Sequence, residues 1–189
     1  MRIGLCGSHR TGKTTLATAV SEHLHAPFLK TETSEVFKQA GLDPARPMPF
    51  EKRMWIQDKV LDAAVALWRG AGSRFVTDRT PVDMMAYTLA DVRGETEADF
   101  SRLSAYLERC FSSVNSFFDV LVVVRPGITL VYEEGKAALN RAYMEHLDYL
   151  ILGLAGDERL KARVVRLGRG VASVPERVRA VFEGIGAGS

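Results

Sequence analysis

The chain has 189 residues, of which 47% are hydrophobic and 25% charged, an ordinary balance for a soluble globular protein. This length predicts one domain, residues 1–189, with a sizeable core. The net charge of +2 suits polyanionic ligands without demanding nucleic acid, and two cysteines are too few for a disulfide framework or a zinc site. We therefore expect a protein of the reducing cytoplasm.

Membrane attachment is not expected either. No apolar run reaches the roughly 18 residues that a membrane span requires. A loop motif begins within the first ten residues, so we expect no signal peptide. Cys6 lies at a strand end beside that motif, where a small core residue is a simpler interpretation than a nucleophile.

The first predicted elements are a strand, a loop and a helix. Residues 1–6 alternate apolar and other side chains, which is typical of a short strand, and Leu16, Val20 and Leu24 recur at helical spacing. Between them, residues 7–14 match the phosphate-binding pattern G-x-x-x-x-G-K-[ST] at every fixed position. The alternative, a chance glycine-rich turn that caps a helix, does not explain the full strand–loop–helix context.

Each fixed residue of this loop answers a physical need. Glycine lets the backbone wrap closely, so that N–H groups converge on an anion at a helix N-terminus. Lys13 supplies a cation for the β- and γ-phosphates, and the Thr14 hydroxyl is the expected Mg²⁺ ligand. Without nucleotide, we expect Lys13 to face solvent unpaired. The residues predicted to bind ATP here are Gly7, Ser8, His9, Arg10, Thr11, Gly12, Lys13, Thr14 and Thr15.

Strand and helix patterns alternate along the rest of the chain. Short apolar runs predict strands at residues 26–30, 75–77, 118–124 and 162–167. Helical spacing predicts helices at residues 35–40, 51–68, 95–114 and 137–154, one that opens at Pro81, and a last one capped by Ser173. Such alternation predicts an α/β fold with a parallel sheet covered on both faces. The phosphate loop would then lie outside the carboxyl ends of the strands.

Two carboxylates at predicted strand ends are candidates for chemistry. Asp78 follows the strand at 75–77, where it could orient Mg²⁺, accept a substrate proton or simply cap the next helix. Glu32 follows the second strand and could take the proton from an attacking hydroxyl, with Glu35 as a nearby rival. We assign the base to Glu32 and metal orientation to Asp78, and the reverse assignment stays open.

Arginines from three segments of the chain complete the predicted site. Arg79 has the planar fork that suits a phosphate, although a salt bridge to a carboxylate is an equal alternative. Residues 125–142 are predicted to form a lid that places Arg141, together with Arg125 or Lys136, against the transferring phosphoryl group. The other interpretation of this segment is an ordinary loop and a charged helix face. Gly168 and Arg169, after the last strand, lie where an adenine ring could rest on backbone.

Together these motifs resemble the P-loop nucleoside and nucleotide kinases, and most of all their branch of ribosylnicotinamide-kinase-like and related small AAA-type ATP-binding domains. The resemblance implies a three-layer α/β/α fold with a five-stranded parallel sheet, in the order 2-3-1-4-5, and a small lid. It also implies that Glu32 lies near the acceptor, Asp78 and Arg79 at the catalytic centre, and Arg141 in the lid. The chain departs from the family in that Lys38 is the first cation after Glu32, and that the lid has one clear arginine.

The motifs thus predict a kinase that moves the γ-phosphoryl group of ATP, with Mg²⁺, to a nucleoside- or nucleotide-like acceptor. The sequence contains no Asn-Lys-x-Asp element, which disfavours a GTPase. Two alternatives are a DNA kinase that acts on a hydroxymethylated pyrimidine in phage DNA, and an ATP-binding switch protein without kinase activity.

Overall fold

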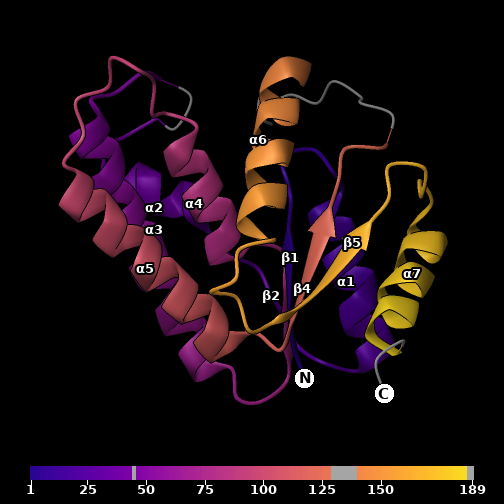
Figure 1. Ribbon diagram of the computed structural model, residues 1–189. Coiled ribbons are helices and arrows are strands. Elements are labelled where there is room, and N and C mark those ends of the chain that lie inside the picture. The colour runs from indigo at the N-terminus through magenta and orange to yellow at the C-terminus, as the bar shows by residue number, and fades with distance from the viewer. Residues whose placement is uncertain (44–45, 129–139, 187–189) are drawn as a thin grey trace.

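The computed structural model describes residues 1–43, 46–128 and 140–186 (Figure 1). Five strands form one sheet in the order β2-β3-β1-β4-β5, and every neighbouring pair is parallel. The strands are β1 (Arg2–Cys6), β2 (Phe28–Leu29), β3 (Phe75–Thr77), β4 (Val120–Val124) and β5 (Arg163–Leu167). Both the parallel sheet and its predicted order are confirmed. All carboxyl ends therefore meet at one edge, the upper edge in Figure 1.

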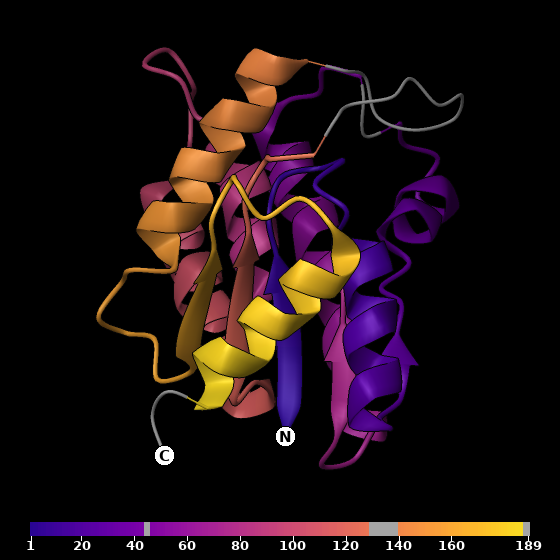
Figure 2. The ribbon, with the colours of Figure 1, turned by 90° about the vertical axis from the view of Figure 1, so that its right-hand side faces the viewer.

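Helices cover both faces of this sheet, which confirms the three-layer architecture. They are α1 (Lys13–Leu24), α2 (Thr33–Gln39), α3 (Phe50–Gly70), α4 (Pro81–Leu89), α5 (Phe100–Phe117), α6 (Arg141–Leu154) and α7 (Val174–Gly186). Helices α1 and α7 lie side by side on one face (Figure 2). Among the described residues, no helix has both the length and the apolar composition that crossing a membrane would take.

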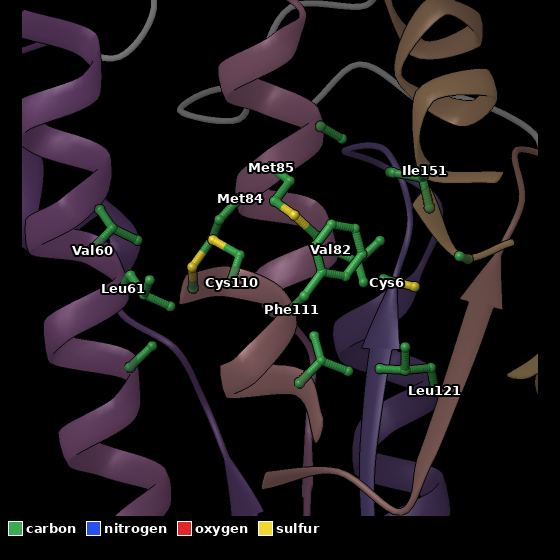
Figure 3. Packing of buried hydrophobic residues seen from close by; sticks show 14 of the residues in the cluster. Cys6, Val60, Leu61, Val82, Met84, Met85, Cys110, Phe111, Leu121 and Ile151 are labelled. Atoms are coloured by element: carbon green, nitrogen blue, oxygen red, sulfur yellow. The ribbon is translucent and has the colours of Figure 1, made fainter. Parts of the chain in front are cut away.

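Alternation along the central strands divides the core into two layers. All five residues of β4 are buried, and Leu121 belongs to the layer under α3–α6, whereas Val122 belongs to the layer under α1 and α7. Figure 3 shows Leu121 and Cys6 facing Phe111 and Ile151 in the larger layer. Cys6 is fully buried, and burial raises the pKa of its thiol well above the usual value, so its interpretation as a core residue is confirmed.

Helices α5 and α6 begin directly after residues that cap them, and these positions differ from the starts predicted by apolar periodicity. The helix expected at 95–114 begins at Phe100, because the Asp99 carboxylate accepts hydrogen bonds from the N–H groups of Ser101 and Arg102. Helix α6 likewise begins after Asn140, and residues 137–139 of the expected helix lie outside the described residues. The predicted cap Ser173 is confirmed, because its hydroxyl oxygen accepts from the Glu176 N–H at 3.4 Å and its own N–H donates to the Glu176 carboxylate at 3.3 Å.

Candidate functional site

The phosphate loop leaves β1 at the carboxyl edge of the sheet and enters α1. A Cβ at residue 7 would collide with the carbonyl oxygen of Val124, so only glycine lets the loop pass β4. The backbone then turns through left-handed conformations at Arg10 and Gly12, with φ of 58° and 81°. Gly12 is the N-cap of α1 and provides no side-chain cap, so the first N–H groups of the helix face outward for an anion. Thr14 and Thr15 are exposed there.

Helix α4 anchors the first half of the loop. The Gly7 N–H donates to Asp83 Oδ1 at 3.0 Å, and the His9 N–H donates to Tyr87 Oη at 3.1 Å. Asp83 also accepts from the N–H and hydroxyl of Thr80, at 2.9 and 3.1 Å, and is fully buried. Burial raises the pKa of Asp83, and it raises the pKa of Tyr87 to about 12, so the phenol stays protonated.

Lys13 does not face solvent, and this expectation was wrong. The side chain is 8% exposed, and its Nζ donates to the carbonyl oxygens of Gly7 and Ser8, both at 2.7 Å. A buried ammonium needs acceptors, and the loop's own carbonyls supply them. Burial lowers the pKa of Lys13, while the charge of Asp83 opposes that shift. An incoming phosphate must therefore take the place of two backbone carbonyls.

The predicted metal pair comes together. The Thr14 hydroxyl donates to Asp78 Oδ2 at 2.6 Å, across 64 residues of sequence. Thr80 caps α4 through a reciprocal capping box with Asp83, so the alternative in which Asp78 caps that helix is wrong. A hydroxyl and a carboxylate beside a phosphate loop are the oxygen ligands that Mg²⁺ prefers, so these residues fit the ion.

Arg79 and three rings lie next to the loop on the α4 side. The Arg79 guanidinium lies 5.5 Å from the centre of the Tyr87 ring, and it forms no ion pair with any described residue. The Tyr143 ring of α6 is 6.5 Å from Tyr87 and 5.9 Å from His9, centre to centre. The salt-bridge alternative for Arg79 thus finds no partner within the described residues, and its cation stays beside an aromatic cluster.

Glu32 is at the same edge as Asp78 but has another partner in this structure. The hydroxyls of Thr31 and Thr77 are 3.2 Å apart, which keeps the ends of β2 and β3 side by side. The Glu32 carboxylate lies 3.2 Å from Lys30 Nζ, with 58% of its side chain exposed. Its role as a base therefore remains a prediction. Its rival Glu35 is also exposed.

The predicted lid at 125–142 is described only at its two ends. Residues 129–139, including Lys136, lie outside the described residues. Arg125 donates to Asp148 from Nε and Nη2, at 3.0 and 2.6 Å, and Asp148 is 1% exposed. This ion pair, and not a phosphate contact, occupies the Arg125 side chain here. Arg141 is exposed at the start of α6, which lies near the carboxyl edge of the sheet (Figure 1).

Of the residues predicted to contact adenine, Arg169 has a side chain that is already bonded within the protein, so only backbone atoms are left for that contact. The Arg169 guanidinium donates to Glu145 at 2.5 and 2.6 Å and to Asp148 at 2.7 Å, which ties the segment after β5 to α6. Residues 168–171 form a turn in which the Val171 N–H donates to the Gly168 carbonyl. A nucleotide contact through Gly168 and the Arg169 backbone stays a prediction, and the Arg169 side chain has a structural role.

Three residues at this site escaped the sequence analysis: Asp83, Tyr87 and Arg177. The Thr80-x-x-Asp83 spacing was a readable signal, because it is the pattern of a capping box. Arg177 gave no signal, since its Nη1 donates at 2.7 Å to the carbonyl of Thr11, 166 residues away. Long-range bonds of this kind are visible only once the chain is folded.

Comparisons with known proteins agree with this geometry. The model of a family described as AAA domain matches residues 2–115. None of the curated proteins that were compared matches the chain.

Solved structures share the fold at low sequence identity. Deoxyadenosine kinase from M. mycoides with bound dCTP has a TM-score of 0.70 at 14% identity, over 99% of this chain and 100% of that one. A NadR protein in complex with NR has a TM-score of 0.64 at 20% identity, over 97% of this chain and 51% of its own. Thymidylate kinase from Candida albicans has a TM-score of 0.57 at 14% identity, over 98% and 90%. The likeness is one of fold.

Proposed function

The chain belongs to the AAA domain family, and from its phosphate loop and its fold we propose that it is an ATP-dependent kinase for a nucleoside- or nucleotide-like acceptor. The observation that carries this proposal is the 2.6 Å contact between Thr14 and Asp78 beside a fully formed phosphate loop. Solved structures of the same fold include a deoxyadenosine kinase and a thymidylate kinase, which supports the same reaction class.

The chain's own residues would bind the triphosphate in the second half of the loop. N–H groups at the start of α1 would donate hydrogen bonds to phosphate oxygens. Lys13, which now donates to the carbonyls of Gly7 and Ser8, would donate to the β- and γ-phosphates instead. Thr14 and Asp78 would hold Mg²⁺, which would supply neutralising charge for the phosphates. Arg141 would add a second cation once the nucleotide is bound.

The acceptor would lie on the side of the loop that faces α4. Arg79, Tyr87, Tyr143 and His9 offer a cation and ring faces there, and these suit a planar base better than a bare sugar. Glu32 would leave Lys30, which holds it only at the exposed surface, and take the proton from the attacking hydroxyl. Breaking an exposed ion pair costs little, so this exchange is compatible with catalysis.

A transfer assay with γ-labelled ATP tests the proposal. The acceptors are free nucleosides, nucleoside monophosphates, ribosylnicotinamide and DNA that contains hydroxymethylated pyrimidines. Label on a free nucleoside or nucleotide supports the proposal. Label on DNA alone supports the DNA kinase, and release of inorganic phosphate alone supports a switch protein.

Two substitutions then separate the roles of the carboxylates. Glu32→Gln should lower kcat by about 10²–10⁴-fold with an unchanged Mg²⁺ dependence, as the loss of a general base does. Asp78→Asn should weaken the apparent affinity for Mg²⁺-ATP. Glu35→Gln tests the rival base, and we expect it to behave as wild type. A nearly silent Glu32→Gln, with Asp78→Asn leaving Mg²⁺ dependence unaltered, would reverse the two assignments.

A further inference from the structure

Arg177 in α7 is a buried guanidinium that holds two separate segments of backbone. Only 3% of the residue is exposed. Its Nη1 donates to the Thr11 carbonyl at 2.7 Å, and its Nε donates to the Val171 carbonyl at 2.7 Å. No described carboxylate forms an ion pair with it. An arginine stays protonated in proteins, so a full positive charge lies against the phosphate loop without a counter-charge from the described residues.

The bond to Thr11 sets the direction of an N–H group. The Thr11 carbonyl and the Gly12 N–H belong to one peptide plane, and in a trans peptide they point in opposite directions. The described residues contain no cis peptide bond. Holding the oxygen toward α7 therefore fixes the Gly12 N–H away from α7. Gly12, at φ 81°, has no side chain that restricts its backbone conformation. The hydrogen bond from Arg177 restricts the peptide plane instead.

The bond to Val171 connects the same side chain to the segment after β5. Residues 168–173 lead from β5 into α7, which packs beside α1 (Figure 2). The sequence predicts an adenine contact at Gly168 and Arg169 of this segment and phosphate contacts at residues 7–14. One guanidinium thus joins the two segments expected to receive opposite ends of the nucleotide.

We propose that Arg177 is a positioning residue for the nucleotide, which orients the phosphate loop and couples it to residues 168–173. The inference rests on the proposed function, because it requires a nucleotide at the loop. The positive charge adds to the attraction for a polyanion. Because the two bonds already restrict both segments, these segments lose less conformational freedom when the nucleotide binds.

Calorimetric titrations with ATP and with inorganic tripolyphosphate test this role. Arg177→Gln should weaken ATP binding by about 10–100-fold, because hydrogen bonds to a charged donor are among the strong ones. Tripolyphosphate should lose less affinity than ATP, since it makes no contact with the coupled segment. The KM for the acceptor and the kcat at saturating ATP should stay within a few-fold of wild type. Arg179→Gln, an exposed change on the same helix, is the control and should bind as wild type.

Arg177→Lys serves where the glutamine variant does not fold. An ammonium keeps the charge but cannot reach both carbonyls with the fixed fork of a guanidinium, so ATP affinity should fall by more than about threefold, and by less than in Arg177→Gln. A wild-type protein that binds neither ligand contradicts the proposed function. The inference is overturned if wild type binds ATP and both Arg177 variants bind ATP as tightly as wild type does. So does an equal loss of ATP and tripolyphosphate affinity, because it removes the coupling.

Discussion

The two halves of the phosphate loop are held in opposite ways. In residues 7–9 the protein binds backbone N–H groups, through Asp83 and Tyr87 of α4. In residues 11–14 it binds a backbone carbonyl, through Arg177 of α7. The contacts from outside the loop are therefore acceptors for the first half and a donor for the second half, while Lys13 of the loop itself donates to the Gly7 and Ser8 carbonyls.

This difference separates support from binding. The N–H groups of Gly7 and His9 already donate to side chains of the protein in this structure. The N–H groups at the start of α1 have no partner within the helix, and the protein fixes that half through an oxygen that an anion would avoid. The loop is therefore preformed while the donors that an anion needs are kept for it.

The largest expected effect comes from Lys13, because its side chain spans both halves. Lys13→Ala should lower the rate of phosphoryl transfer by at least about 10²-fold, since a cation that stabilises the transferring phosphate is lost. The melting temperature should also fall, because the Gly7 and Ser8 carbonyls lose their donor, but the variant should stay folded. Steady-state rates at saturating ATP measure the effect, with the exposed Lys59→Ala as the matched control. A rate above about a tenth of wild type would show that this loop is not the catalytic phosphate site.

Arg141 tests whether the second half receives a further cation during transfer. Arg141→Ala should lower kcat by about 10–10²-fold and ATP affinity far less, because charge that develops only in transfer is stabilised only there. Binding titrations and steady-state kinetics on the same preparation separate the two quantities. Equal losses in both, or no loss, would leave Arg141 as part of a charged helix face.

Asp83 tests the support of the first half. Asp83→Ala should lower the free energy of unfolding by about 3 kcal/mol, because it leaves the Gly7 N–H and two donors of Thr80 without an acceptor. Asp83→Asn keeps one acceptor oxygen and should cost less. Urea unfolding measures both variants. A stability equal to wild type in the alanine variant would mean that α4 does not hold the loop.

The raised pKa of Asp83 also predicts how the stability difference between wild type and Asp83→Asn changes with pH. Because the pKa of Asp83 is raised in the folded protein, the folded state keeps its proton at pH values where the unfolded chain has lost it. Wild type should therefore lose stability relative to Asp83→Asn as pH rises from about 4 through the raised pKa. Urea unfolding of both proteins between pH 4 and 7 measures the difference. A relative gain for wild type over that range would contradict the raised pKa.

The smallest effect is expected at Tyr87. Tyr87→Phe removes the acceptor for the His9 N–H but keeps the ring beside Arg79 and Tyr143, so unfolding should become easier by about 1 kcal/mol. ATP affinity should change by less than about threefold, since the second half of the loop is untouched. Tyr149→Phe, at a side chain 66% exposed, is the control. If Tyr87→Phe lost as much ATP affinity as Arg177→Gln, the first half of the loop would contribute to nucleotide binding as much as the second half does.

What the sequence predicted well depended on local patterns. The phosphate loop, the strand at 75–77 and the helix start at Pro81 are written in neighbouring residues, and the structure has each of them. The β-branched run at 118–124 predicted a buried strand, and β4 begins two residues later. The sheet order came from the resemblance to known kinases, since strand patterns alone carry no information on which strands become neighbours.

What the sequence missed depended on partners from distant segments. Nothing near Lys13 in the sequence says that two carbonyls of its own loop accept its protons. Arg169 looked available for a nucleotide until the fold placed Glu145 and Asp148 beside it. Charged residues of this kind fit several roles, and the tertiary structure chooses among them.

The position of Arg177 has a consequence for the order in which the protein is made. Residues 7–14 leave the ribosome before α7, because this helix, which holds their Thr11 carbonyl, is synthesised after every strand of the sheet. A nascent chain that lacks α7 already carries the whole motif, but the Gly12 peptide is not yet fixed. Nucleotide would then bind tightly only to chains that have completed α7, and by mass action it would stabilise those chains alone.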